Sequence, residues 1–203
     1  MAKFAILPQN ANSRYYMSHC QNLQAILAEL MADAQQIDGE EVNALGEAIM
    51  QAKRVFVAGA GRSGFAARAF ANRLMHLGFS TWFVGEPTTP SIQPGDLLII
   101  GSGSGETASL VTMAQKAHKQ GAKIATLTIY PEHTIGNIAE TIIRIPGITA
   151  KSEHATSKAE TIQPTGSSFE QLSWLIYDSV VIALKEKTAQ TDAQMFSRHA
   201  NLE

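Results

Sequence analysis

RVFVAGAGRSGF (residues 54–65) and DLLIIGSGSGETAS (residues 96–109) each run from an apolar segment into a Gly/Ser turn and then into a helical pattern. If both apolar segments are parallel strands of one sheet, both turns lie at the same edge of that sheet. Two helix N-termini, free backbone N–H groups and several hydroxyls would then meet there, and such groups bind anions without a metal. The two stretches therefore predict an α/β fold with a phosphate site at one sheet edge.

Length and composition narrow the class of protein. The 203 residues suit one domain, which we expect to extend over residues 1–203. The formal net charge of −2 comes without a strong Lys/Arg cluster, which argues against nucleic-acid binding. A single cysteine excludes an internal disulfide and favours a reducing compartment, and no apolar run is long enough to cross a membrane. We therefore expect a cytoplasmic protein without a membrane partner.

Hydrophobic spacing predicts helices and strands in alternation. Two N-terminal helices are expected within residues 13–52, the first capped by Ser13 and the second by Asp38, with Glu41 completing a capping box. A βα core follows over about residues 54–187, and a tail over residues 188–203. The expected strands are residues 55–58, 81–84, 97–101, 123–128 and 141–145, and the last long helix covers about residues 168–187. Strands separated by helices indicate a doubly wound, three-layer, mostly parallel sheet.

The first turn, Gly59 to Gly64, matches G-x-G-x-x-G between a strand and a helix. One reading is a dinucleotide site with Glu86 on the ribose, which would make the protein a nicotinamide-dependent oxidoreductase. Another is a tight turn whose glycines only permit close packing. In a third, Ser63 is the N-cap of the helix and its hydroxyl and N–H contact a phosphoryl group.

The second turn alternates glycine with hydroxyl side chains at a helix start. Ser102, Ser104 and Thr107 can donate hydrogen bonds to phosphate oxygens while the glycines let the backbone wrap the anion. A Walker lysine is missing from the motif, so nucleotide hydrolysis is not implied. The alternative is that Ser104 caps the helix and Glu106 complements the helix dipole.

Two further residues are candidates for catalysis. Glu170 lies three residues after Ser167, which fits a capping box, but a carboxylate in the first turn of a helix can also face the sheet edge as a base. His199 is the fifth residue from the end of the printed sequence; it belongs either to a solvated tail or to a neighbouring subunit's site. The other histidines and the single cysteine have no metal-ligand spacing, so we expect no metal.

The strings GAGRSG, GSGSGET, TIQPTGSSFEQ and HANLE occur in this order, and with them the chain resembles the sugar isomerase (SIS) domain family, and within it the hexuloisomerases. The resemblance implies a flavodoxin-like fold and cofactor-independent isomerisation of D-arabino-hex-3-ulose 6-phosphate to D-fructose 6-phosphate through a cis-enediolate, in the ribulose monophosphate pathway. It also implies a homotetramer that works with 3-hexulose-6-phosphate synthase. A non-catalytic phosphosugar-sensing module is the alternative within the family.

The resemblance also assigns roles to residues. It makes Glu170 the proton-transferring base and His199 a helper placed in a neighbour's site. It gives the grip on the sugar phosphate to the two turns, with these substrate-binding residues: Gly61, Arg62, Ser63, Ser102, Gly103, Ser104, Gly105, Glu106 and Thr107.

Overall fold

A computed structural model describes residues 18–148 and 161–202. Its five strands form one sheet in which every neighbouring pair is parallel, in the order β2-β1-β3-β4-β5. The strands are β1 Val55–Gly59, β2 Thr81–Phe83, β3 Leu97–Gly101, β4 Lys123–Thr128 and β5 Thr141–Arg144. All five strands expected from the sequence are confirmed, with the same first residues and with ends that differ by at most one residue. A parallel sheet is buried on both faces, which explains the apolar runs that made these strands visible.

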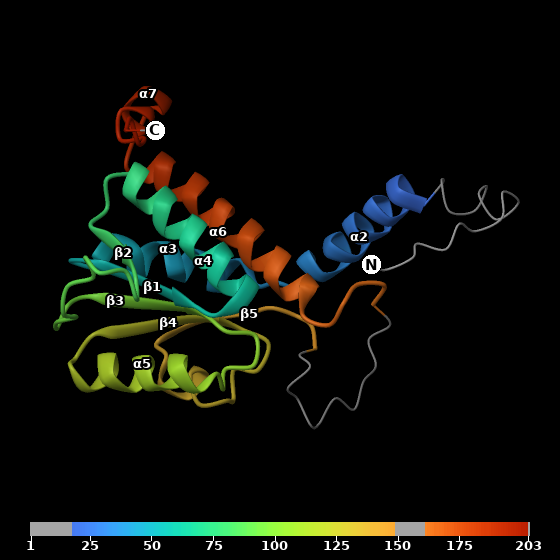
Figure 1. Ribbon diagram of the computed structural model, residues 1–203, viewed down its shortest axis with the longest axis horizontal. Helices are drawn as coiled ribbons and strands as arrows, with labels where there is room; N and C mark the ends of the chain where they lie inside the picture. Colours follow the sequence, from blue (N-terminus) through green and yellow to red (C-terminus); the bar gives the residue numbers. More distant parts are fainter. Residues whose placement is uncertain (1–17, 149–160, 203) are drawn as a thin grey trace, which may run out of the picture.

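Helices cover both faces of the sheet (Figure 1). Helices α3 Gly39–Gln51, α4 Gly61–His76 and α6 Ser167–Lys187 lie on one face, and α5 Ala108–Lys119 lies on the other. The larger core cluster joins α3, α4 and α6 to the sheet, and a smaller one lies under α5. The expected three-layer α/β arrangement is confirmed.

Helix capping agrees with the sequence only in part. Asp38 caps α3 as expected, and its side chain accepts a hydrogen bond from the backbone N of Glu40. The predicted capping box is wrong, because the Glu41 carboxylate instead accepts from the backbone N of Arg144 at 2.8 Å. Glu41 therefore ties α3 to the edge strand β5. The predicted cap Ser13 lies outside the described residues.

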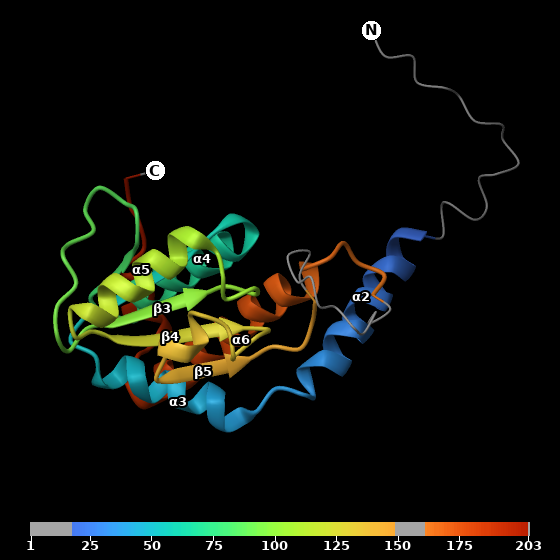
Figure 2. The ribbon, with the colours of Figure 1, turned by 90° about the horizontal axis from the view of Figure 1, so that it is seen from below.

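Helix α2 Ser18–Ala34 extends away from the rest of the protein (Figures 1 and 2). Its side chains Leu23, Leu27 and Met31 are more than half exposed, at 55%, 55% and 65%. Two short elements were not predicted, the 3₁₀ turn η2 Gly136–Ile138 and helix α7 Asp192–Phe196 in the tail. None of the helices in the described ranges has the length and apolar character needed to cross a membrane.

Candidate active site

The two Gly/Ser turns leave the sheet side by side. Strands β1 and β3 are neighbours, and Gly59 at the end of β1 is in register with Gly101 at the end of β3. The chain continues from β1 into α4 on one face and from β3 into α5 on the other. Adjacent parallel strands whose connections leave in opposite directions open a crevice at their carboxyl ends, where α/β proteins bind ligands. The predicted common edge is confirmed.

In the first turn, the glycines allow α4 to pack directly on β1. A Cβ on Gly59 would lie 2.9 Å from the Cα of Gly64, and a Cβ on Gly64 would lie 2.8 Å from the Gly59 carbonyl oxygen. Ala60 is the N-cap of α4, so the prediction that Ser63 caps this helix is wrong; Ser63 is the third helical residue. Ser63 still lies in the first turn of α4, at the carboxyl edge of the sheet. Close packing, one of the three readings of this motif, is therefore confirmed.

In the second turn the Ser104 hydroxyl accepts a hydrogen bond from the backbone N of Glu106 at 3.3 Å, whereas the hydroxyls of Ser102 and Thr107 are not used in this way. Ser102 is only 4% exposed, and its Oγ has no hydrogen-bond partner in the part of the chain that the structure describes. Thr107, not Ser104, is the N-cap of α5, and its side chain makes no capping hydrogen bond to a described residue. A buried hydroxyl without a partner is costly unless a ligand or water completes it. Ser102 and Thr107 are therefore available to an anion at this turn.

Glu106 connects the second turn to the loop after β4. Its carboxylate accepts hydrogen bonds from the backbone N of Thr134 at 2.7 Å and from the Thr134 hydroxyl at 2.9 Å. These hydrogen bonds lower the pKa of Glu106 below its usual value. This carboxylate, expected from the resemblance among the substrate-binding residues, is thus bound to the loop after β4.

The loop after β4 contributes a histidine that the sequence did not single out. His133 Nδ1 lies 2.7 Å from the carbonyl oxygen of Ser104, and Tyr130 stacks on the imidazole. A carbonyl only accepts, so Nδ1 carries the proton in this contact. No spacing in the sequence links residue 133 to residue 104, and only the approach of the two loops could have revealed it.

Glu170 faces the first turn from the start of α6. The N-cap of α6 is Gly166, which has a φ of 92°, so the capping-box reading of Ser167 and Glu170 is wrong. Both side chains instead meet Arg62 at the start of α4: Arg62 Nη1 donates to Ser167 Oγ at 3.2 Å and lies 3.0 Å from Glu170 Oε2. The Glu170 side chain is 22% exposed and that of Arg62 is 61% exposed. The carboxylate is therefore held at the crevice end of the two helices.

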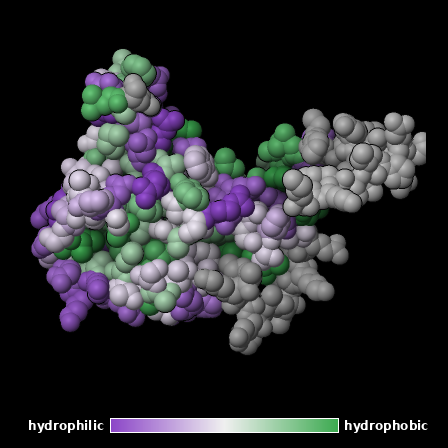
Figure 3. Space-filling view, viewed as in Figure 1, coloured by the Kyte–Doolittle hydropathy of each residue, from purple (hydrophilic) through white to green (hydrophobic). Residues whose placement is uncertain are grey.

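A groove of about 530 Å³ lies beside this ion pair. Arg62 and Glu170 supply its charged groups, and α2, α4 and α6 supply an apolar wall. The apolar residues include Leu23, Leu27, Phe65 and Trp174. Figure 3 shows hydrophobic surface on both sides of the notch between α2 and the body.

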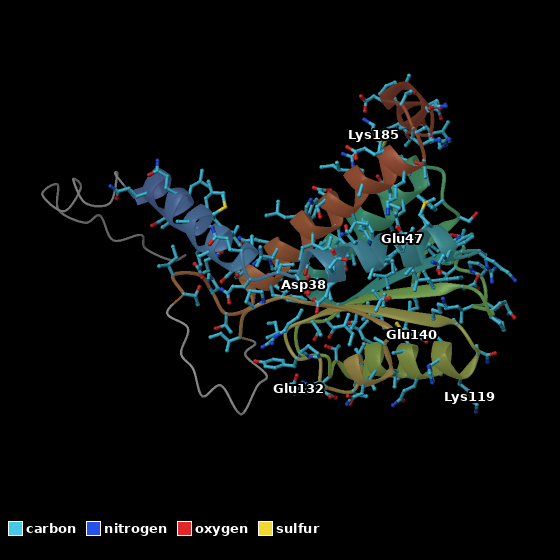
Figure 4. The ribbon with its side chains drawn as sticks, turned by 180° about the vertical axis from the view of Figure 1, so that it is seen from behind. Asp38, Glu47, Lys119, Glu132, Glu140 and Lys185 are labelled. Carbon is cyan, nitrogen blue, oxygen red and sulfur yellow. The ribbon has the colours of Figure 1, made fainter. Side chains whose placement is uncertain are left out.

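His199 lies at the other end of the molecule. Its ring stacks on His76, the last residue of α4, with 4.2 Å between centroids. Arg198 anchors the tail there by donating to the His76 carbonyl at 2.9 Å. Burial, together with the neighbouring His199 and Arg73, lowers the pKa of His76. Figure 4 shows Lys185 near this tail, at the end of α6 far from Glu132 and the loops of the crevice.

Glu86, the ribose candidate of the dinucleotide reading, forms an ion pair with Arg68 of α4. Arg68 also lies over the ring of Phe83, 4.2 Å from its centroid. The carboxylate is thus engaged on the flank of α4.

The chain is similar to known proteins over most of its length. The SIS domain model matches residues 48–173. A 3-hexulose-6-phosphate isomerase from Bacillus subtilis is 48% identical over 178 residues, which cover 88% of this chain and 95% of that protein. A protein of the same name from Mycobacterium gastri is 40% identical and covers 90% of each chain. A crystal structure from Methanococcus jannaschii, which infers a molecular function of 3-hexulose-6-phosphate isomerase, superposes with a TM-score of 0.76 at 31% identity, over 90% of this chain and 99% of that one. With a family model that spans more than half of its length and relatives that align almost end to end, the chain belongs to the SIS domain family.

Proposed function

We propose that this protein converts D-arabino-hex-3-ulose 6-phosphate into D-fructose 6-phosphate. The observation that carries the proposal is the position of Glu170, a carboxylate held at the crevice end of α4 and α6 beside the phosphate turns. Relatives that share 48% and 40% of their residues with this chain are named for the same reaction. A phosphosugar sensor needs hydroxyls for the phosphate but has no use for a base next to them.

The reaction moves a carbonyl from carbon 3 to carbon 2 without a change in redox state. A base removes the proton from carbon 2, a cis-enediolate forms, and the proton returns at carbon 3. In this proposal Ser102, Ser104 and Thr107 bind the phosphate, and Glu170 moves the proton. Binding of the remote phosphate holds a short, flexible sugar in register, so it contributes to rate as well as to affinity.

A second group must move protons between the two sugar oxygens, and we assign this role to His199 of another copy of the chain. Helix α6 separates the two residues within one copy, because the seventeen residue-to-residue steps from Glu170 to Lys187 rise by roughly 25 Å. The exposed apolar side chains of α2 and the groove are compatible with such an assembly. We propose a homotetramer, working in the cytoplasm with the synthase that supplies its substrate.

A coupled assay tests the reaction. 3-Hexulose-6-phosphate synthase would generate the substrate, and fructose 6-phosphate would be detected through glucose-6-phosphate isomerase and an NADP-linked dehydrogenase. We expect product to form at a rate that increases with the amount of this protein. Absence of product above the uncatalysed background would reject the proposed reaction.

Glu170→Gln is the informative variant, because it keeps the size of the side chain and removes the base. We expect turnover to fall by about three orders of magnitude or more, with circular dichroism and thermal unfolding little changed. Glu47→Gln, at the exposed ion pair with Lys187 between α3 and α6, is the matched control and should retain full turnover. Near-normal turnover in Glu170→Gln would remove Glu170 from the mechanism.

A further inference from the structure

Arg62 is shared between the two parts of the candidate site. It is the second residue of α4, at the mouth of the crevice, yet its hydrogen bond is to Ser167 and its ion pair is with Glu170, both in α6. Both contacts use the same nitrogen, Nη1. Its Nη2 and Nε make no hydrogen bond within residues 18–148 and 161–202, and the side chain is 61% exposed. The guanidinium therefore still has donors to offer while it holds the carboxylate.

Arg62 is the one charged partner of the Glu170 carboxylate among the described residues, whereas Arg62 can also bind a phosphate. Glu170 Oε2 is buried and makes no hydrogen bond within the described part of the chain apart from its ion pair with this guanidinium. Arg62, by contrast, lies in the first turn of α4, next to Ser63, and the second turn is close by: a Cβ on Gly101 would lie 3.9 Å from the carbonyl oxygen of Ser63. A phosphate bound at this turn brings close to two negative charges and three acceptor oxygens, and a guanidinium binds it in a bidentate manner. A phosphate is thus a stronger partner for Arg62 than a single carboxylate.

We propose that Glu170 and the substrate phosphate compete for Arg62, so that phosphate binding draws the guanidinium away and frees the carboxylate to act on the sugar. This inference rests on the proposed function and extends it. Arg62 is then both a phosphate ligand and a positioning residue, which restrains the base in the empty site. It links occupation of the phosphate site to the availability of the base, which favours phosphorylated over unphosphorylated sugars in the chemical step.

Phosphate binding tests the competition without any turnover. Inorganic phosphate would be titrated while the fluorescence of Trp174, which lines the groove with both residues, is followed in a Trp82→Phe background. We expect Arg62→Gln to weaken binding and Glu170→Gln to tighten it about two- to fivefold, the effect of breaking a partly exposed ion pair. The double variant that combines Arg62→Gln with Glu170→Gln should bind phosphate with the same affinity as Arg62→Gln alone. A matched control is Arg68→Gln, on the same helix and in a comparable exposed ion pair, which should bind phosphate as the parent does.

Additivity separates competition from simple charge repulsion. If Glu170 merely repels phosphate, its removal tightens binding equally with and without Arg62, and the two effects add. Additive effects, or unchanged binding in Glu170→Gln, would therefore overturn the inference.

Turnover is a second test, because Arg62→Gln should have opposite effects on the sugar without phosphate and on the 6-phosphate. With D-arabino-hex-3-ulose, Arg62→Gln should be several-fold faster than the parent, because its base is already free. With the 6-phosphate the same variant should have a lower kcat/KM, through the lost phosphate contact. A variant slower on both sugars would reject the restraint on Glu170. If the parent itself does not isomerise the 6-phosphate, the proposed function fails instead, and the binding cycle still decides the competition.

Discussion

The two Gly/Ser turns look alike in sequence and differ in what they do. In the first turn Gly59 and Gly64 are in backbone contact, and their role is to bring α4 onto β1. In the second turn a buried serine hydroxyl, that of Ser102, lacks a partner among the described residues. The glycines of the first turn serve packing, whereas the second turn leaves a hydroxyl unpaired, although both turns match a phosphate-binding pattern. A glycine motif therefore has to be judged by what a Cβ would touch and by which polar atoms remain unpaired.

The largest effect is expected from Gly64→Ala in the first turn. The new methyl group would lie 2.8 Å from the Gly59 carbonyl oxygen, and both atoms belong to rigid elements. We expect the free energy of unfolding to fall by about 2–4 kcal/mol in urea denaturation. Gly46→Ala in α3 is the control: a Cβ there meets no described atom within 4 Å, so it should be neutral or stabilise by about 0.5–1 kcal/mol. Equal stability of the two variants would contradict a packing role for the first turn.

A smaller effect is expected where the second turn touches the core. A Cβ on Gly101 would lie 3.0 Å from the hydroxyl of Tyr177, which is buried, stacked on Phe70 and without a described hydrogen-bond partner. We expect Gly101→Ala to cost about 1–3 kcal/mol of unfolding free energy, and Tyr177→Phe alone to be nearly neutral.

The double variant tests this contact. Removing the hydroxyl with Tyr177→Phe should recover most of the loss caused by Gly101→Ala, as residues in contact do in a double-mutant cycle. Costs that simply add would show that Gly101 is needed for another reason.

For Ser102→Ala in the second turn we expect a loss of ligand affinity and not of stability. Because the hydroxyl makes no described hydrogen bond, its removal should leave unfolding free energy unchanged or slightly higher, while affinity for inorganic phosphate falls about tenfold. The control is Thr126→Val on β4, whose buried hydroxyl donates to the Ile100 carbonyl at 3.0 Å. That variant should lose about 1 kcal/mol of stability and keep its phosphate affinity. Unchanged phosphate affinity in Ser102→Ala would place the anion elsewhere.

The smallest effect concerns the loop that supports the second turn. Hydrogen bonds from Thr134 lower the pKa of Glu106 in the folded protein, so they stabilise the fold above the ordinary carboxyl pKa, and this contribution is lost as the pH falls through the lowered value. Thr134→Val removes the side-chain donor. We expect it to reduce slightly the loss of stability between pH 7 and pH 3, measured by urea unfolding at each pH. A steeper acid dependence than in the parent would be the wrong sign.

Much of the fold could be predicted from the sequence, because its signals are local. Apolar runs of four to six residues marked all five strands, and helical periodicity marked α6 within one residue of its start at Ser167. A hydrogen bond from Ser167 N to the Pro164 carbonyl at 3.0 Å closes the turn that precedes this helix. Helix α7 was missed because five residues with no buried side chain leave no periodic pattern.

The candidate site was harder to predict from the sequence, since its contacts join distant parts of the chain. The sequence marked Glu170 and Arg62 separately, but nothing local showed that Arg62 meets Ser167, 105 positions away. Likewise the tail gave no sign that His199 stacks on His76 at the far end of α4.

The order of strands and helices along the chain, the two glycine turns and the carboxylate at the start of the last long helix could all be read from the amino-acid sequence. Backbone preference and hydrophobic periodicity are properties of neighbouring residues, so no tertiary contact is needed to recognise them. The three-dimensional fold was needed to show which turn packs and which leaves a hydroxyl unpaired, that Glu170 pairs with Arg62, and that His199 lies away from Glu170 in the same copy. Those outcomes depend on how α4 and α6 align across the sheet, and side-chain contacts between elements far apart in the chain exist only after the core has closed.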